Sequence, residues 1–209
     1  MRDGRLTGNR KFRGPMFDYS LHMTRLIKDI AEKCPELAHI DTTKILVAIS
    51  RSRNRRKDGL QAKLVPMKFR GGRQVEQIGK DGYEMPNLFH KGSEILYLVY
   101  FCLPRFQNLS FDTKMTIIFH ELYHISPSFN GDIRRFPGRC YQHSHSEKEY
   151  DRIVRELAYE YLKHQSSKDL TRFLRSRYDA LVQQYGEISG LKIIMPEPIL
   201  LKPKQGMLF

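Results

Sequence analysis

The stretch Thr116-Ile-Ile-Phe-His-Glu-Leu-Tyr-His-Ile125 decides the fold of this chain. It contains His120-Glu121-Leu122-Tyr123-His124, an H-E-x-x-H pattern. On a helix, side chains four residues apart lie on the same face, one turn apart. The pattern therefore predicts a helix whose two imidazoles bind one zinc ion. Glu121, on the neighbouring edge, can reach a zinc-bound water without being a ligand.

Apolar residues of the same helix predict that its other side is buried. Met115, Ile118, Phe119 and Leu122 repeat at the i, i+3, i+4, i+7 spacing of an amphipathic helix. Ser110 or Asp112 is expected to cap the N-terminus of the helix. The alternative interpretation is an ordinary amphipathic helix with two surface histidines and no metal.

A third metal ligand is expected downstream, because catalytic zinc sites usually have three protein ligands and leave one position to water. Pro127 and Asn130 stand where the metzincin pattern requires Gly and His, so that subclass is excluded. The next possible donors are His143, His145, Glu147 and Asp151. His143 is the first choice for the third ligand, and His145 is the alternative.

The chemistry predicted from this ligand set is hydrolysis of a peptide bond. Zinc lowers the pKa of its water and polarises the scissile carbonyl. Glu121 is expected to take the water's proton and pass it to the leaving amine. Asp132 is a candidate for orienting a ligand imidazole. The candidates for stabilising the oxyanion, which the sequence does not rank, are Tyr123, Tyr141, Arg135 and Arg139.

Length and composition indicate one α+β domain with extensions. The 209 residues are 40% hydrophobic, which is enough for a core. The expected boundaries are a flexible basic arm at 1–15, a metallopeptidase domain at 16–188 and a Pro-containing tail at 189–209. No apolar run is long enough to span a membrane, and the start lacks the apolar region of a signal peptide. Three scattered cysteines also favour the cytoplasm.

The order of predicted elements is an N-terminal helix, three or four strands, the metal helix and C-terminal helices. The N-terminal helix runs from Phe17 to Pro35, and the strands are expected at 44–50, 60–69 and 94–101, with a Gly-rich loop at 70–82. Further helices are expected from about Glu147 and at 168–185. The core face expected for the first of them comprises Ile153, Leu157 and Tyr161, with Val154, Ala158 and Leu162 beside them. One edge of the sheet should face the metal site, where it can bind an extended peptide by β-augmentation.

A net charge of +13 and a pI near 9.7 predict a polyanionic partner. One basic cluster is the arm at 1–15. The other comprises Arg51, Arg53, Arg55, Arg56 and Lys57. It is expected at the tip of a hairpin between the strands at 44–50 and 60–69. DNA is a candidate partner of the arm and the hairpin, and a plain solvated surface is the alternative.

The last five residues, Gln205-Gly-Met-Leu-Phe209, resemble the Q-x-x-L-F peptide by which bacterial replication and repair proteins dock on the DNA sliding clamp. In that peptide the glutamine hydrogen-bonds at the rim of a pocket that the leucine and phenylalanine fill. Gln205, Leu208 and Phe209 are therefore candidate clamp-docking residues. The alternative is that they pack on their own domain, since exposed apolar side chains are costly.

Several segments together resemble the putative phage metallopeptidase family, a zincin-type group related in layout to the SprT-like proteases. They are His-Glu-Leu-Tyr-His-Ile-Ser-Pro at 120–127, Phe-Asn-Gly-Asp-Ile-Arg at 129–134, His-Ser-His-Ser at 143–146 and Tyr-Asp at 150–151. The resemblance covers roughly residues 16–165. It implies a small α+β zincin fold, with His120, His124 and a downstream histidine as ligands and Glu121 as the base. The chain has no cysteines for the C-terminal zinc ribbon that SprT-like proteases often carry.

The leading hypothesis is a zinc-dependent peptidase that works near nucleic acid. An alternative of a different class is a DNA-associated adaptor whose zinc is structural, in a closed site with both His143 and His145 bound. A third possibility is zinc-dependent hydrolysis of an amide that is not a peptide.

Overall fold

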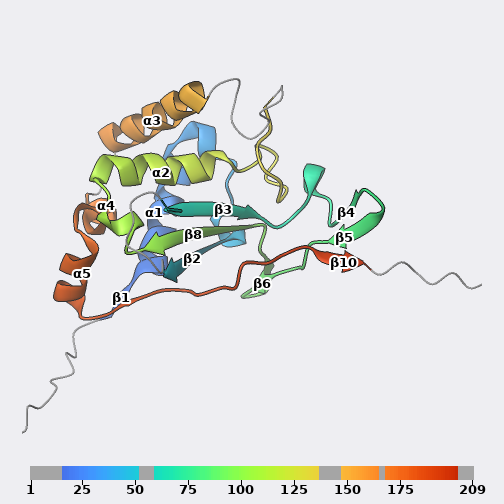
Figure 1. Cartoon of the computed structure of the whole chain (residues 1–209). Coiled ribbons are helices and arrows are strands. Elements are labelled where there is room, and N and C mark those ends of the chain that lie inside the picture. The colour runs from blue at the N-terminus through green and yellow to red at the C-terminus, as the bar shows by residue number, and fades with distance from the viewer. Residues whose placement is uncertain (1–15, 52–58, 137–146, 165–167, 202–209) are drawn as a thin grey trace, which may run out of the picture.

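The computed structural model of the chain describes residues 16–51, 59–136, 147–164 and 168–201 (Figure 1). Its centre is a three-stranded sheet of β2 (Ile45–Arg51), β8 (Tyr97–Leu103) and β3 (Ala62–Pro66), in the order β2-β8-β3. β2 runs parallel to β8, and β3 runs antiparallel to it. With the helices described below, this sheet confirms the predicted α+β fold.

β8 is the middle strand because all seven of its residues, Tyr-Leu-Val-Tyr-Phe-Cys-Leu, are buried. Such a continuous apolar run suits a strand that is covered on both faces. β3 is an edge strand that ends at Pro66, as the proline predicted. The predicted basic hairpin is wrong, because β8 lies between β2 and β3 and these two strands are not paired with each other. Arg51 is the exposed last residue of β2.

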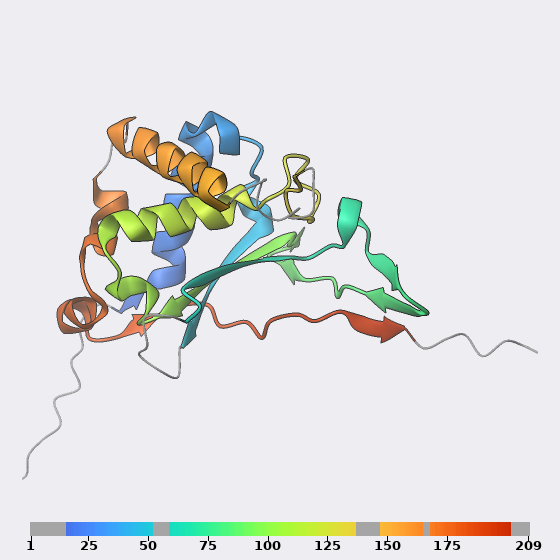
Figure 2. The same ribbon diagram turned by 45° about the horizontal axis from the view of Figure 1, so that its top comes forward.

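Two helices cover one face of the central sheet, and a third packs on top of one of them. α1 (Tyr19–Lys33) packs on β2, α2 (Phe111–Tyr123) packs on β3, and α3 (Glu147–His164) packs on α2. Figure 1 shows α2 lying between α3 and the sheet, and Figure 2 shows the same layers after rotation. The apolar faces of these helices and of the sheet form the larger of two buried clusters. α1 begins two residues later than predicted, because the side chain of Asp18 caps it by accepting from the Leu21 N–H at 3.0 Å.

The predicted helix at 168–185 is interrupted in the structure. It consists of α4 (Asp169–Arg172), the short 3-10 helix η5 (Phe173–Arg175) and α5 (Tyr178–Tyr185). The carbonyls at the break accept hydrogen bonds from outside the helix instead of continuing it. The side-chain amide of Gln107 donates to Phe173 O and Ser176 O, each at 2.7 Å. Gln107 is fully buried, so these bonds satisfy a polar group inside the core.

A second, smaller sheet lies beyond the end of β3 and consists of β4 (Val75–Ile78), β5 (Asp81–Glu84) and β10 (Ile199–Leu201), in the order β10-β5-β4. The prediction of a loop at 70–82 is therefore wrong. Figure 1 shows the chain from β9 (Ile188–Ser189) running under the central sheet to β10. On the way, Ile193 packs into the second buried cluster, on the sheet face opposite the helices.

The remaining elements are short. β1 (Phe17–Asp18) pairs in parallel with β9, and β6 (Phe89–His90) pairs with β7 (Ser93–Glu94). The other 3-10 helices are η1 (Pro35–Leu37), η2 (Thr42–Lys44), η3 (Arg70–Gly72) and η4 (Phe106–Asn108). No helix in the described ranges is both long enough and apolar enough to cross a membrane.

Several predicted contact residues lie outside the described residues, and their roles stay predictions. They are the arm at 1–15, the cluster residues Arg53, Arg55, Arg56 and Lys57, and the terminal residues Gln205, Leu208 and Phe209. The nucleic-acid contacts and the clamp contact therefore stay predictions, and the cytoplasmic location is a prediction from the sequence alone.

Candidate metal centre

Helix α2 positions the H-E-x-x-H residues in its last turn. Ser110 is the N-cap, and its hydroxyl accepts a hydrogen bond from the Thr113 N–H at 3.2 Å. The four residues predicted to anchor the helix, Met115, Ile118, Phe119 and Leu122, are all buried. This buried face holds the opposite side of the last turn toward β3 and its edge.

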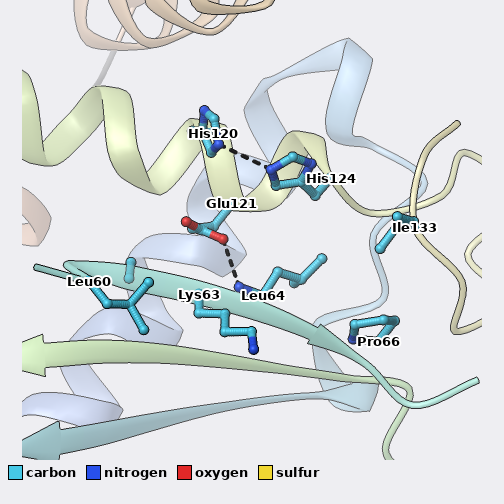
Figure 3. Close-up of a pocket in the computed structure, with 9 residues that line it drawn as sticks. Leu60, Lys63, Leu64, Pro66, His120, Glu121, His124 and Ile133 are labelled. Carbon is cyan, nitrogen blue, oxygen red and sulfur yellow. Dashed lines mark hydrogen bonds between the residues drawn. The ribbon is translucent and has the colours of Figure 1, made fainter. Parts of the chain in front are cut away.

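His120 and His124 lie side by side, as their spacing predicts. Their Nε2 atoms are 3.1 Å apart, and the rings are close to perpendicular at 86° (Figure 3). Two imidazole nitrogens that bind one tetrahedral zinc ion, each at about 2.0–2.1 Å, are about 3.3 Å apart. The pair therefore fits two ligands of a single metal ion.

Glu121 lies beside the pair and is almost completely buried, with 8% of its surface exposed. Its Oε2 accepts a hydrogen bond from the backbone N–H of Leu64 in β3 at 2.6 Å (Figure 3). Burial raises the pKa of Glu121 to about 7, although the Leu64 N–H and the charge of Lys63 both act to lower it. The carboxylate of Glu121 therefore lies between α2 and the edge strand β3.

A cavity of about 580 Å³ opens along β3 and exposes both imidazoles and the carboxylate (Figure 3). Its lining residues are Leu60, Ala62, Lys63, Leu64, Pro66, His120, Glu121, His124 and Ile133. A second hollow of about 300 Å³ shares Ala62, His120 and Glu121 and extends to Gly59, at the start of the strand. Together the two cavities extend along the edge strand β3, on both sides of Glu121.

Tyr150, in the first turns of α3, contacts both histidines and was not predicted as a site residue. Its hydroxyl lies 3.1 Å from His124 Nδ1 and 3.2 Å from His120 O. The side chain is completely buried, and burial raises its pKa well above the ordinary value, so the hydroxyl stays protonated. The available signal was helical register: Tyr150 precedes the buried residues Val154, Ala158 and Tyr161 at i, i+4, i+8 and i+11.

Arg134 satisfies the carbonyls at the C-terminal end of α2, which lack partners inside the helix. Its backbone N–H donates to His124 O at 2.6 Å, and its Nε donates to Tyr123 O at 2.8 Å. Its guanidinium also lies 4.1 Å from the centre of the Tyr123 ring. These contacts hold the turn that carries the histidine pair.

The role predicted for Asp132, orienting a ligand imidazole, stays a prediction, and its bonds among the described residues go to other groups. Its carboxylate accepts hydrogen bonds from the N–H groups of Gly71 and Ile133 and from the guanidinium of Arg135. Burial opposes ionisation, but these donors outweigh it and lower the pKa of Asp132. These bonds fasten the loop after α2 to η3.

The two described oxyanion candidates, Tyr123 and Arg135, have packing or ion-pair partners away from the large cavity. Tyr123 packs against Tyr150 and Phe136, and Arg135 forms an ion pair with Asp132 at 2.8 Å. Neither Tyr123 nor Arg135 is among the described residues that line the large cavity. Both stay predictions.

The expected third ligand, its alternative and two of the oxyanion candidates lie outside the described residues: His143, His145, Tyr141 and Arg139. Within the described part of the chain, no group of three or more His, Cys, Asp or Glu side chains is arranged to hold a metal ion.

Comparison with known proteins identifies the class. Residues 19–176 match the family model described as "Putative phage metallopeptidase", which covers well over half of the chain. The chain belongs to this family, which confirms the resemblance seen in the sequence. Membership indicates a metallopeptidase, a hydrolase that uses a metal ion and acts on protein or peptide substrates. Neither the curated proteins nor the solved structures contain a significant match.

Proposed function

We propose that this protein is a zinc-dependent peptidase, with His120, His124 and His143 as metal ligands and Glu121 as the general base. His145 is the alternative third ligand. The observation that carries the proposal is the separation of 3.1 Å between the two Nε2 atoms, beside a buried carboxylate that lines the same cavity. Neutral imidazoles and one open position are the ligand chemistry of catalytic zinc.

The flanks of the segment 137–146 support a third ligand from within it. Phe136, which precedes the segment, packs against Tyr150, with the ring centres 6.0 Å apart. Tyr150, four residues after the segment, contacts both histidines. Because the chain leaves and returns next to the pair, both His143 and His145 are within reach of it.

Glu121 is well placed to move a proton. When bound, zinc polarises the scissile carbonyl and acidifies water. The Leu64 N–H holds one oxygen of the Glu121 carboxylate, and the other has no hydrogen-bond partner among the described residues. That free oxygen can accept a proton from the attacking water and then donate it to the leaving amine.

The edge of β3 supports a peptide as the substrate rather than another amide. β3 pairs only with β8 among the described strands, so its other edge faces the cavity. An extended peptide can add to such an edge through main-chain hydrogen bonds. The side chains of Leu60, Pro66 and Ile133 give this cavity apolar walls, which favours a substrate segment with apolar residues.

The test is the substitution Glu121→Gln, which removes the base but keeps a side chain of the same shape. The variant should bind zinc like the wild type and lose at least about 100-fold in the hydrolysis of an unfolded protein such as reduced casein, because a general base contributes about 10²–10⁴-fold. Glu156→Gln is a matched control, since that exposed glutamate on α3 is ion-paired with Arg152.

The possible outcomes separate the proposed function from the alternatives. Hydrolysis by the wild type that persists in Glu121→Gln would overturn the assigned mechanism. Wild-type protein that binds zinc and cleaves no unfolded protein would favour the adaptor with a structural zinc site. The control should cleave at the wild-type rate.

A further inference from the structure

We propose that Tyr150 is a positioning residue that fixes the tautomer and the direction of the His124 ring. This inference rests on the proposed function, because it concerns how one of the two proposed ligands is held. Tyr150 comes from α3, whereas both histidines come from α2, so the contact joins two helices at the metal centre.

The direction of each hydrogen bond follows from the chemistry of the partners. The carbonyl of His120 can only accept, so the Tyr150 hydroxyl is the donor across that 3.2 Å contact. The hydroxyl has one proton, and it must therefore accept in the 3.1 Å contact with His124 Nδ1. This requires the proton of the neutral His124 ring to lie on Nδ1.

The Nδ1–H tautomer leaves a lone pair on Nε2 of His124. That atom is the one that lies 3.1 Å from Nε2 of His120, on the side of the cavity. Only an unprotonated ring nitrogen can bind a metal ion, so the hydrogen bond from Nδ1–H selects the form of His124 that can be a ligand.

Packing fixes the position of the hydroxyl itself. Tyr150 is completely buried. Its ring stacks on that of His124 at 27°, with the centres 5.2 Å apart, and meets the ring of His120 edge-on with the centres 4.9 Å apart. Because the aromatic contacts hold the ring in place, a phenylalanine at this position should keep the packing and remove only the hydroxyl.

The experiment compares Tyr150→Phe with Tyr161→Phe. Tyr161 lies three turns further along the same buried stripe of α3, and its hydroxyl donates to Asp29 Oδ2 at 2.6 Å. Both variants lose a buried tyrosine hydroxyl, so both should be less stable. Zinc affinity, measured by competition with a chromogenic chelator, should fall about 10- to 100-fold in Tyr150→Phe only, the usual cost of removing a partner of a ligating histidine.

Imidazole nitrogen NMR of the metal-free wild type gives a second measurement that does not depend on any variant folding. His124 should be a single Nδ1–H tautomer in the wild type and in Tyr161→Phe. Wild-type protein with the proton of neutral His124 on Nε2, or equal zinc affinity in the wild type and Tyr150→Phe, would overturn the role of Tyr150 alone. Wild-type protein that binds no zinc would overturn the proposed function as well.

Discussion

Helix α2 buries polar side chains at two places, and their surroundings differ. Near its N-terminus, Lys114 is 1% exposed, and its ammonium donates to Leu174 O at 2.7 Å and Ser176 O at 3.1 Å. Near its C-terminus, His120, Glu121 and His124 line a cavity of about 580 Å³. Lys114 is not among the described residues that line this cavity.

The difference distinguishes Lys114, a polar group with a structural role, from the histidine pair, whose ring nitrogens are positioned for metal binding. Fixed backbone carbonyls satisfy Lys114, and its contacts hold the turn between η5 and α5 against the helix. At the other end, two ring nitrogens face each other across a distance that one metal ion can bridge. Burial alone therefore does not identify the site, whereas polar atoms that converge on an open space do.

The largest effect that would test this contrast is expected from His124→Ala. Loss of one proposed ligand should lower zinc affinity by more than the about 10- to 100-fold cost of losing a supporting hydrogen bond, and hydrolysis should be lost with it. The free energy of unfolding of the metal-free protein should fall by only about 1 kcal/mol, the usual net contribution of a hydrogen bond such as the one to Tyr150. Zinc titration and urea unfolding measure the two quantities.

If the His124→Ala protein bound zinc as tightly as the wild type, the histidine pair near the C-terminus of α2 would not be the metal site. His164→Ala is a suitable control, because that exposed histidine lies at the end of α3 beside Glu160. It should leave zinc affinity unchanged.

The second effect concerns the other end of α2 and depends on pH. Burial, reinforced by the charge of Arg177, lowers the pKa of Lys114 from 10.5 to about 8. Between these two pH values the unfolded chain holds the Lys114 proton and the folded chain does not, so the free energy of unfolding rises with pH. Below about pH 8 both states hold the proton, and this gain is absent.

Lys114→Met should remove this pH dependence and leave Leu174 O without the Lys114 donor, at a cost of about 1–3 kcal/mol, whereas Ser176 O keeps its bond from Gln107. The difference in unfolding free energy between wild type and variant should grow by up to about 3 kcal/mol from pH 8 to pH 10.5. Urea unfolding across this range measures it. A difference that stays flat would show that Lys114 titrates as an exposed lysine does, and zinc affinity should be the same in both proteins.

The parts of the site that could be predicted from sequence are those that one helix determines. The spacing of His120 and His124 fixes their neighbouring positions whatever the rest of the fold, and the apolar repeat fixes the buried face below them. Likewise, Pro66 indicated an edge strand because proline cannot donate to a ladder. These features depend on local geometry, which the sequence encodes directly.

The features that were missed depend on contacts between distant segments. The position of β8 between β2 and β3 follows from its complete burial, which a linear pattern of strands does not reveal. Tyr150 contacts the histidines only because α3 packs across α2. The core face expected for α3 began at Ile153 and Val154, so it did not include the first turn of the helix, which contains Tyr150.

The smallest effect on α2 is expected at its N-terminus, from Ser110→Ala. The Ser110 hydroxyl accepts from the Thr113 N–H and also lies 2.6 Å from the Thr113 hydroxyl. Its removal should lower the free energy of unfolding by about 1 kcal/mol, the usual cost of losing an N-cap. Ser110→Asp should restore stability, because a carboxylate can cap the helix and also interacts favourably with its dipole. Neither variant should change zinc affinity, since more than two helical turns separate residue 110 from His120. If Ser110→Ala weakened zinc binding, the two ends of α2 would be coupled, and the separation between its structural and chemical polar groups would not hold.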